Sequence, residues 1–491
     1  MNATETETPR SPAPEADAPA QAVDWEDFRD HLATADKDGH RRWIYAKQPH
    51  GRYYRWRTKV SWLLLAIMFI GPFVRINGNP LLLFNIIDRR FSILGQIFWP
   101  QDAIILAVAL LLFFTGIIIF TTAFGRLWCG WTCPQTLLME MVFRKLEYLI
   151  EGDAGAQRAL AAAPWTREKI IKRAGKQALF FALSFLIANT LLSYIIGTGP
   201  LWKIVTDDPR QHVTGLFFML LFTVIFYLIF ARFREQACTF ICPYGRFQSA
   251  ILDENTVIVA YDHKRGEKRA HLHSGQLHHD REAAGLGDCV DCHQCVAVCP
   301  TGIDIRNGTQ MECVNCTACM DACDAIMDRT SRPRGLIRYA SLNSIERGEK
   351  FRFTPRMGLY AVVLTALVSL FAFLIFTRAA VEATLLRAPG ALFQQTATGD
   401  IENLYTLKVI NKTSRDVPVE LKLERQTGVL TLMGGQKMVV PKEQLAQTSV
   451  LIELPPGSLP GANTKLRIGI YAEGKRVQTI DTVFVGPRKY N

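Results

Sequence analysis

Cysteine is missing from most of this 491-residue chain: residues 1–128 and 324–491 contain none, and all twelve cysteines lie between 129 and 323. Cysteines gathered at such short spacing favour metal ligation over a disulfide framework. An apolar segment is also missing from the first 24 residues, which are rich in Pro, Ala and Glu. We therefore expect no signal peptide, and we expect residues 1–40 to form a disordered cytoplasmic tail.

Long apolar runs are present, and basic connectors separate them. A helix needs about 17–25 mostly apolar residues to cross the hydrocarbon core of a membrane. The runs predict a membrane α-helical bundle with about five transmembrane helices, over about 60–76, 103–124, 178–197, 214–231 and 356–377. The first run is the shortest and contains Pro72. The stretch 79–99 that follows is expected to lie at the lipid interface and to support this short span there.

The net charge of +11 lies largely in the connectors, so it predicts membrane orientation and not nucleic-acid binding. The connector 125–177 carries nine Lys and Arg, whereas 199–213 carries two, which two Asp balance. By the positive-inside rule, the N-terminus, 125–177 and 232–357 are cytoplasmic. Five crossings then place the C-terminal part, 378–491, in the periplasm.

The C-terminal part alternates apolar and polar residues with a period of two, which is typical of half-buried strands. Turn residues separate five such segments: 401–413, 417–424, 447–455, 464–474 and 475–486. This spacing predicts an all-β, immunoglobulin-like sandwich over 378–491. Because this region has no cysteine and no evident acid–base cluster, we expect it to be a docking module.

Two consecutive Cys-x2-Cys-x2-Cys-x3-Cys runs, at 289–299 and 313–323, form the pattern of a two-cluster bacterial ferredoxin. In that pattern each run supplies three ligands to one [4Fe–4S] cluster and the fourth ligand to the other. The predicted ligands of cluster one are Cys289, Cys292, Cys295 and Cys323. Those of cluster two are Cys313, Cys316, Cys319 and Cys299. Zinc is the alternative, but two complete runs disfavour it, and the predicted ferredoxin-like domain covers 253–355 on the cytoplasmic side.

The other four cysteines form two Cys-x-x-x-Cys-Pro pairs: Cys129 with Cys133, and Cys238 with Cys242. The proline after each pair predicts that Cys133 and Cys242 lie at helix N-termini, where the helix dipole favours a thiolate. An apolar span precedes each pair, so the region 41–252, with its four predicted spans, contains an internal repeat. If the two copies pack about a pseudo-two-fold axis, the four sulfurs converge and suit Cu(I), zinc or an iron–sulfur centre. The alternative is four buried, inert thiols at helix caps.

The segment after Pro134 predicts an amphipathic helix. Its expected apolar face is Leu137, Leu138, Met141, Val142, Leu149 and Ile150. Its expected polar face is Glu140, Arg144, Lys145, Glu147 and Glu151.

A histidine-rich loop spans 262–288 and contains His263, His271, His273, His278 and His279. These imidazoles suit transient binding of a transition metal. The favoured interpretation is a solvated polar loop, because Lys and Arg are mixed among them.

The order of these parts resembles the CcoG/FixG/RdxA family of cytochrome c oxidase accessory proteins. The resemblance rests on the two Cys-x-x-x-Cys-Pro pairs, on CVDCHQCVAVCP with CVNCTACMDAC, and on a β domain that opens with YTLKVINKT. It covers nearly the whole chain beyond the tail. Membrane polyferredoxins of the nitrate and nitrous-oxide systems look similar in the spans and the paired cysteines, but they are not expected to carry this C-terminal domain.

The resemblance implies a multi-pass protein of the bacterial cytoplasmic (inner) membrane that holds two [4Fe–4S] clusters and contacts membrane lipid. It further implies a role in assembling a cbb3-type oxidase by reducing Cu(II) to Cu(I), as an oxidoreductase. The expected partners are oxidase assembly factors or copper carriers and an unidentified electron donor. Under this hypothesis copper binds at, or is reduced beside, Cys129, Cys133, Cys238 and Cys242.

Two other hypotheses fit the same residues. The protein could carry electrons to a quinone or a periplasmic reductase, although the sequence shows no obvious flavin or nicotinamide site. It could also be a non-catalytic assembly scaffold that docks through its β domain.

Overall fold

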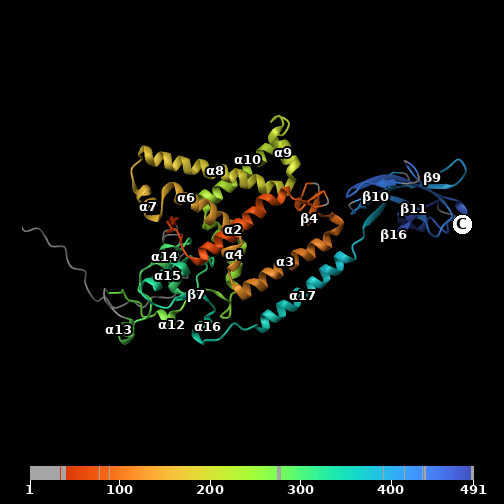
Figure 1. Ribbon diagram of the computed structural model, residues 1–491. Helices are drawn as coiled ribbons and strands as arrows, with labels where there is room; N and C mark the ends of the chain where they lie inside the picture. Colours follow the sequence, from red (N-terminus) through yellow and green to blue (C-terminus); the bar gives the residue numbers. More distant parts are fainter. Residues whose placement is uncertain are drawn as a thin grey trace, which may run out of the picture. The chain divides into compact units, whose positions relative to one another are not determined.

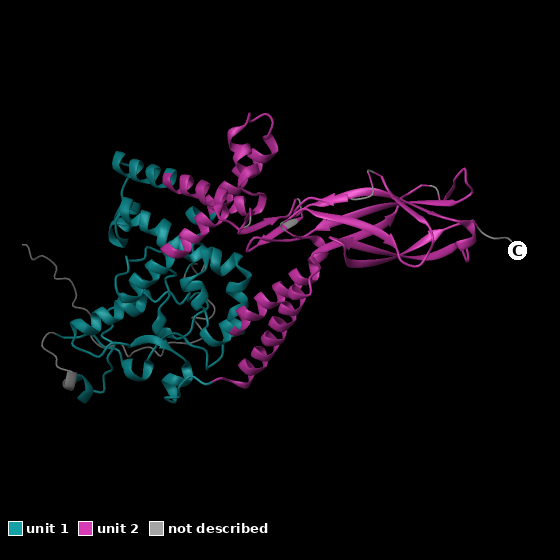
Figure 2. Cartoon of the chain, turned by 45° about the vertical axis from the view of Figure 1, so that its right-hand side comes forward, with its two compact units in different colours: residues 1–61, 120–178, 229–352 teal, residues 62–119, 179–228, 353–491 magenta. Residues whose placement is uncertain are grey.

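The computed structural model describes residues 34, 40–76, 78–87, 89–273, 278–390, 392–413, 415–433, 435 and 438–487. The predicted N-terminal tail lies almost wholly outside these residues. The chain forms two compact units, each assembled from three separate stretches (Figure 2). Unit 1 comprises 1–61, 120–178 and 229–352, and unit 2 comprises 62–119, 179–228 and 353–491.

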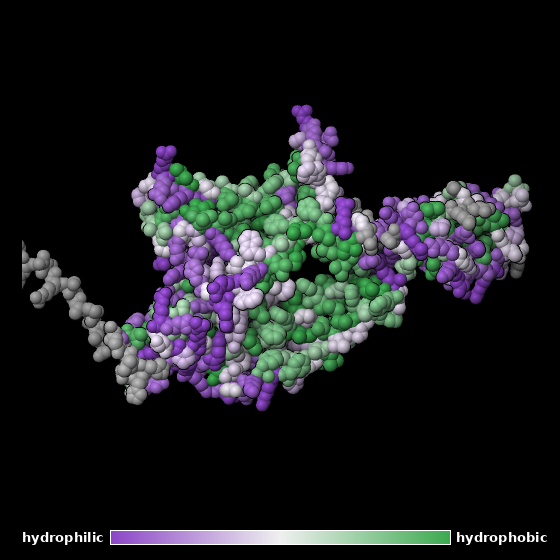
Figure 3. All heavy atoms as spheres, in the orientation of Figure 1, coloured by the Kyte–Doolittle hydropathy of each residue, from purple (hydrophilic) through white to green (hydrophobic). Residues whose placement is uncertain are grey.

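Within the described residues, four helices are long and apolar enough to cross a membrane. They are α3 (Ala103–Phe124), α8 (Arg167–Ile196), α10 (Val213–Leu228) with its π-helical extension η4 (Ile229–Phe233), and α17 (Pro355–Phe376) (Figure 1). Many of their large apolar side chains are exposed, and hydrophobic residues cover these helices in Figure 3. Exposed apolar helices of this length are suited to lipid, so the chain is a membrane protein.

The predicted first span, 60–76, is wrong in its bounds. The helix there, α2, runs over Arg52–Ile70, and a 3-10 turn, Gly71–Phe73, follows it. Pro72 explains the end, because proline disfavours helix at the residue before it and cannot donate a helical hydrogen bond. The first half of α2 is basic, so α2 is not among the four apolar helices.

The stretch 79–99, expected at the lipid interface, folds as short antiparallel strands. The first pair joins β1 (Arg75–Ile76) to β2 (Asn79–Pro80). A second sheet orders β3 (Leu82–Asn85), β4 (Arg90–Ile93) and β5 (Gln96–Phe98). A 3-10 turn, η2 (Pro100–Asp102), then leads into α3.

Asp102 joins the start of α3 to two other parts of unit 2. Its buried carboxylate pairs with Arg378 at 2.7 Å, just after α17, and with Lys412 at 2.6 Å, at the end of β10 (Ile401–Asn411). Two cations around one buried carboxylate hold the end of α17 against the β domain.

The β domain of unit 2 consists of two antiparallel sheets, as predicted. One has the order β12 (Val429–Leu432), β14 (Leu445–Leu454), β10, β8 (Val381–Arg387), with β9 (Gln394–Gln395) paired to β10. The other has the order β13 (Met438–Val440), β11 (Val417–Leu423), β15 (Asn463–Ala472), β16 (Lys475–Val485). Alternate residues of the long strands are fully buried, for example Tyr405, Leu407 and Val409 of β10. The five predicted strands are confirmed, whereas β8, β9, β12 and β13 were missed because their patterns are short or interrupted.

Unit 1 contains the segment that follows α3. The helix α4 (Leu127–Trp131) leads to α5 (Pro134–Leu138), the π-helical turn η3 (Met139–Phe143), α6 (Arg144–Glu151) and α7 (Ala154–Ala162). After α10 come the π-helical η5 (Ala237–Ile241), α11 (Pro243–Phe247) and the 3-10 turn η6 (Gln248–Ala250). In unit 2, α9 (Thr198–Thr206) connects α8 to α10.

The predicted polar face of the segment 134–151 is wrong. Arg144, Glu147 and Glu151 are buried, whereas Leu149 of the expected apolar face is 81% exposed. The reason is a buried ion network: Glu147 pairs with Arg234 and with Lys176 of α8, the latter at 3.2 Å. Buried charges persist only when paired, and these partners lie far away in the sequence.

The ferredoxin-like segment of unit 1 is closed by a two-stranded sheet. Strand β6 (Ile258–Tyr261) pairs antiparallel with β7 (Ile337–Ala340), so the ends of the segment meet. Between the strands lie α12 (His263–Gly266), α13 (His278–Ala283), α14 (Gln294–Ala297), η7 (Ile305–Asn307) and α15 (Ala318–Arg329). The short helix α16 (Leu342–Glu346) follows β7.

Candidate metal centres

Two cavities of unit 1 gather the eight cysteines of the ferredoxin-type runs. The first is lined by Cys289, Cys292, Cys295 and Cys323. The second is lined by Cys299, Cys313, Cys316 and Cys319, and Cys295 borders it as well. The structure thus brings together the two sets that the spacing predicts, with one cysteine of each run crossing to the other set. That these residues bind clusters stays a prediction.

The two runs repeat the same backbone conformation. Asp291 and His293 flank Cys292 with φ of 50° and 53°, and Asn315 and Thr317 flank Cys316 with φ of 51° and 66°. A left-handed conformation costs a non-glycine residue roughly 1–2 kcal/mol. Its occurrence at matching positions indicates that the turns are held in shape to present the thiols.

The chemistry of both cysteine sets fits iron–sulfur clusters. Burial raises the pKa of Cys295 and of Cys313 to about 12 and that of Cys316 to about 11, so these thiols stay protonated unless a cation replaces the proton. Four soft sulfur donors per cavity are the ligand set of such clusters. Among the described residues, no three or more His, Cys, Asp or Glu side chains are grouped closely enough to hold a single metal ion.

The four remaining cysteines also converge within unit 1. Cys133 and Cys242 are the N-cap residues of α5 and α11, as the prolines predict. Burial, with smaller contributions from the nearby thiols of Cys133, Cys238 and Cys242, raises the pKa of Cys129 to about 12. Burial likewise raises the pKa of Cys238 to about 12. The four thiols form one group, although the described residues contain no preassembled single-ion site.

Arg126 connects this four-thiol group to the second ferredoxin-type set. Its Nη1 donates to the carbonyl oxygen of Cys313 at 3.1 Å, and its Nη2 donates to that of Gly245 at 2.6 Å. The guanidinium is buried and interacts electrostatically with Cys129 and Cys238. The sequence did not reveal this role of Arg126, because an arginine that follows an apolar span is usually explained by the positive-inside rule.

Gly130 lets the turn between Cys129 and Cys133 approach the second set closely. A Cβ at Gly130 would lie 2.5 Å from the carbonyl oxygen of Asn315 and 2.6 Å from that of Val314. The Nε of the buried Arg57 donates to the Gly130 carbonyl at 2.6 Å and fixes the turn from α2. Only glycine fits here without displacing backbone.

The histidine-rich loop stays untested. Residues 274–277 and the side chains of His278 and His279 lie outside the described part of the structure. His271 is exposed and lies 4.0 Å from Asp291, and the metal-binding prediction gains no support from the described histidines.

Comparisons with known proteins agree with this arrangement. Family models match a 4Fe-4S binding domain at 106–151, a 4Fe-4S dicluster domain at 233–342, and the IG-like fold at the C-terminal of FixG at 371–487. The first two matches include the Cys-x-x-x-Cys-Pro pairs as well as the ferredoxin-type runs. Fold, site and matches define a membrane-bound iron–sulfur electron-transfer protein.

The relatives are similar along most of their length. RdxA of Cereibacter sphaeroides is 36% identical over 474 residues, which are 91% of this chain and 97% of RdxA. The nitrogen fixation protein FixG of Rhizobium meliloti is 31% identical over 85% of this chain and 87% of its own. This chain belongs to the FixG/RdxA family.

Proposed function

We propose that this protein transfers single electrons to Cu(II) and thereby supplies Cu(I) for the assembly of a cbb3-type cytochrome c oxidase. Each electron reduces one Cu(II) to one Cu(I), and an external one-electron or two-electron reductant replenishes the two ferredoxin-type sites. The observation that carries the proposal is the continuous series of cysteine groups: Cys295 borders both ferredoxin-type cavities, and Arg126 joins the second cavity to the four thiols.

The four-thiol group suits copper as a substrate. Thiolates prefer Cu(I) over harder ions, so a site of four thiols favours the reduced product. Cys238 also borders a small cavity whose lining includes Met139, Glu140 and Glu235. That cavity reaches Thr301, which also borders the second ferredoxin-type cavity.

The proposed topology follows the distribution of basic residues. In this proposal the ferredoxin-like segment faces the cytoplasm of a bacterium and the β domain faces the periplasm. The periplasmic position requires a fifth crossing besides the four apolar helices, which we assign to the apolar half of α2 together with the residues that follow it. In that position the β domain is suited to dock oxidase assembly factors or copper carriers.

The test uses the purified full-length protein, reduced by dithionite and mixed anaerobically with Cu(II). Oxidation of the iron–sulfur absorbance and formation of Cu(I), detected with bicinchoninate, are followed together. We expect the variant in which Cys129, Cys133, Cys238 and Cys242 are all serine to be at least about tenfold slower, a loss of ~1.4 kcal/mol in transition-state stabilisation. The matched control is Thr132→Ser with Thr239→Ser, which changes the same turns and leaves the thiols. An unchanged rate in the four-serine variant would overturn the role of these cysteines.

A further inference from the structure

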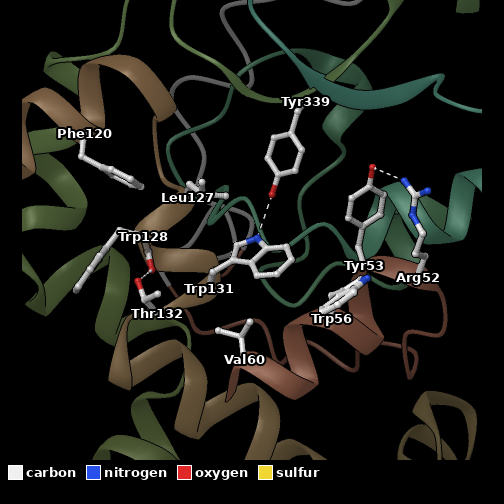
Figure 4. A pocket seen from close by; sticks show the side chains of 10 residues that line it. All are labelled: Arg52, Tyr53, Trp56, Val60, Phe120, Leu127, Trp128, Trp131, Thr132 and Tyr339. Atoms are coloured by element: carbon white, nitrogen blue, oxygen red, sulfur yellow. Dashed lines mark hydrogen bonds between the residues drawn. The ribbon is translucent and has the colours of Figure 1, made fainter. Parts of the chain in front are cut away.

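Unit 1 contains a cavity of about 800 Å³ that lies apart from the two cavities of the ferredoxin-type cysteines. Its walls come from α2, the last turns of α3, the segment 127–132 and β7 (Figure 4). Aromatic side chains and one cation line much of it: Arg52, Tyr53, Trp56, Trp128, Trp131 and Tyr339. This size and lining fit a flat, largely apolar small molecule.

Two phenols supply polar contacts in this cavity. The Tyr339 hydroxyl accepts a hydrogen bond from the Trp131 indole at 3.0 Å, and the Tyr53 hydroxyl accepts one from Arg52 at 3.1 Å. Each phenol is therefore oriented by a donor and keeps its own hydrogen to donate to a ligand oxygen. The two rings stand edge to face with centroids 6.4 Å apart, and both border the same space (Figure 4).

The cavity adjoins both cysteine systems. Trp131 lies between Cys129 and Cys133 in the chain, so the four-thiol turn forms part of the wall. Tyr339 and Cys316 are close enough to interact electrostatically. A redox-active ligand in this cavity would thus lie beside the thiols that the proposed electron path uses.

The cavity also lies where a lipid-soluble ligand can enter. Phe120 belongs to the last turns of the apolar helix α3, and Val60 lies at the start of the apolar half of α2. Trp56 and Trp128 are 57% and 42% exposed, and tryptophans gather at membrane–water interfaces. A lipid acyl chain would need neither the paired phenol donors nor the nearby thiols.

We infer that this cavity binds a membrane quinol and that the quinol is the electron donor of the protein; the second part rests on the proposed function. Oxidation of one quinol to the quinone breaks two O–H bonds and releases two electrons and two protons. The electrons match the two ferredoxin-type sites, one each, and finally reduce two Cu(II) to two Cu(I). The protons pass to water, while Tyr53 and Tyr339 hold the two ligand oxygens in place.

The experiment uses the full-length holoprotein in phosphatidylcholine nanodiscs with decylubiquinol as the probe. The rate of iron–sulfur bleaching by decylubiquinol is divided by the rate with dithionite, so that a general loss of folding cancels. Val60→Trp fills the cavity and is expected to lower this ratio about tenfold, because the indole occupies the space that the quinol needs. Tyr53→Phe removes one donor and is expected to lower it about threefold or more. Trp202→Phe, in the exposed helix α9, is the matched control and should leave the ratio unchanged.

The outcomes separate the two proposals. Quinol-driven bleaching without copper reduction would overturn the proposed function and keep the quinol site. Copper reduction with dithionite but no bleaching by decylubiquinol would overturn the quinol donor alone. In a third measurement, brominated phosphatidylcholine quenches the tryptophan fluorescence and decylubiquinol is then added. If decylubiquinol does not relieve the quenching, the cavity is a lipid site and the inference is overturned.

Discussion

The two cysteine systems of unit 1 are built in different ways. Each ferredoxin-type cavity takes three cysteines from one short run, and left-handed residues inside the run shape its turns. The four-thiol group instead joins two stretches far apart in the chain and depends on Arg126, Arg57 and Gly130 to hold them in place. Changes that loosen the tertiary contacts should therefore disrupt the four-thiol group before they disrupt the ferredoxin-type cavities.

The largest expected effect is the removal of a ferredoxin-type ligand. Cys316→Ser should abolish one of two iron–sulfur EPR signals and lower hydrogen-exchange protection around α15, because ligand binding and folding are coupled at such sites. Cys129→Ser is the counterpart and should keep both signals. Loss of a signal in Cys129→Ser would show that the four-thiol group itself holds iron, and the distinction between the two systems would fail.

The next effect concerns the buried ion network of Glu147, Arg234 and Lys176. Glu147→Gln leaves Arg234 and Lys176 without their shared carboxylate and should destabilise unit 1 by about 3–5 kcal/mol. The measurement is thermal unfolding in detergent. Glu168→Gln removes an exposed pair with Lys172 on α8 and should leave the unfolding temperature close to that of the wild type, because solvent screens an exposed ion pair. Equal effects of the two variants would contradict the burial that the structure assigns to Glu147.

A smaller and more selective effect is expected at Gly130. Gly130→Ala pushes a Cβ into the backbone at Val314 and Asn315, at a cost of about 1–3 kcal/mol. Oxidation by Cu(II) should slow, while both EPR signals persist. Gly155→Ala in α7 meets nothing within 4 Å and should be neutral or slightly stabilising. A Gly130→Ala protein with an unchanged copper rate would show that this close approach does not couple the two systems.

The smallest effect at neutral pH is the acid dependence of the same network. Burial alone would raise the pKa of Glu147, but Arg234 and Lys176 outweigh it and lower that pKa to about 2. The stabilisation is fully present above the unfolded value near 4.5 and is lost as the pH falls towards 2. Unfolding followed between these pH values should show this loss in the wild type and a flatter curve in Glu147→Gln. Parallel curves would contradict the ionised state of Glu147.

Much of the architecture could be predicted because its signals are local. Period-two alternation identified β10, β11, β14, β15 and β16, and long apolar runs identified the four membrane-type helices. The predictions failed where residues distant in the sequence changed the burial that a local pattern predicts. The face of α6 that looks polar in the sequence is buried, since Arg234 and Lys176 neutralise it from other parts of the chain.

The sequence by itself determined how the eight ferredoxin-type cysteines divide into two sets of four, because the spacing within each run limits that division. Only the tertiary structure decided how the thiol groups connect. Arg126 reaches the Cys313 carbonyl, and Gly130 lies against the turn at Asn315, across stretches that no local pattern relates. Such contacts depend on the packing of elements distant in the chain, and a one-dimensional period cannot encode that packing.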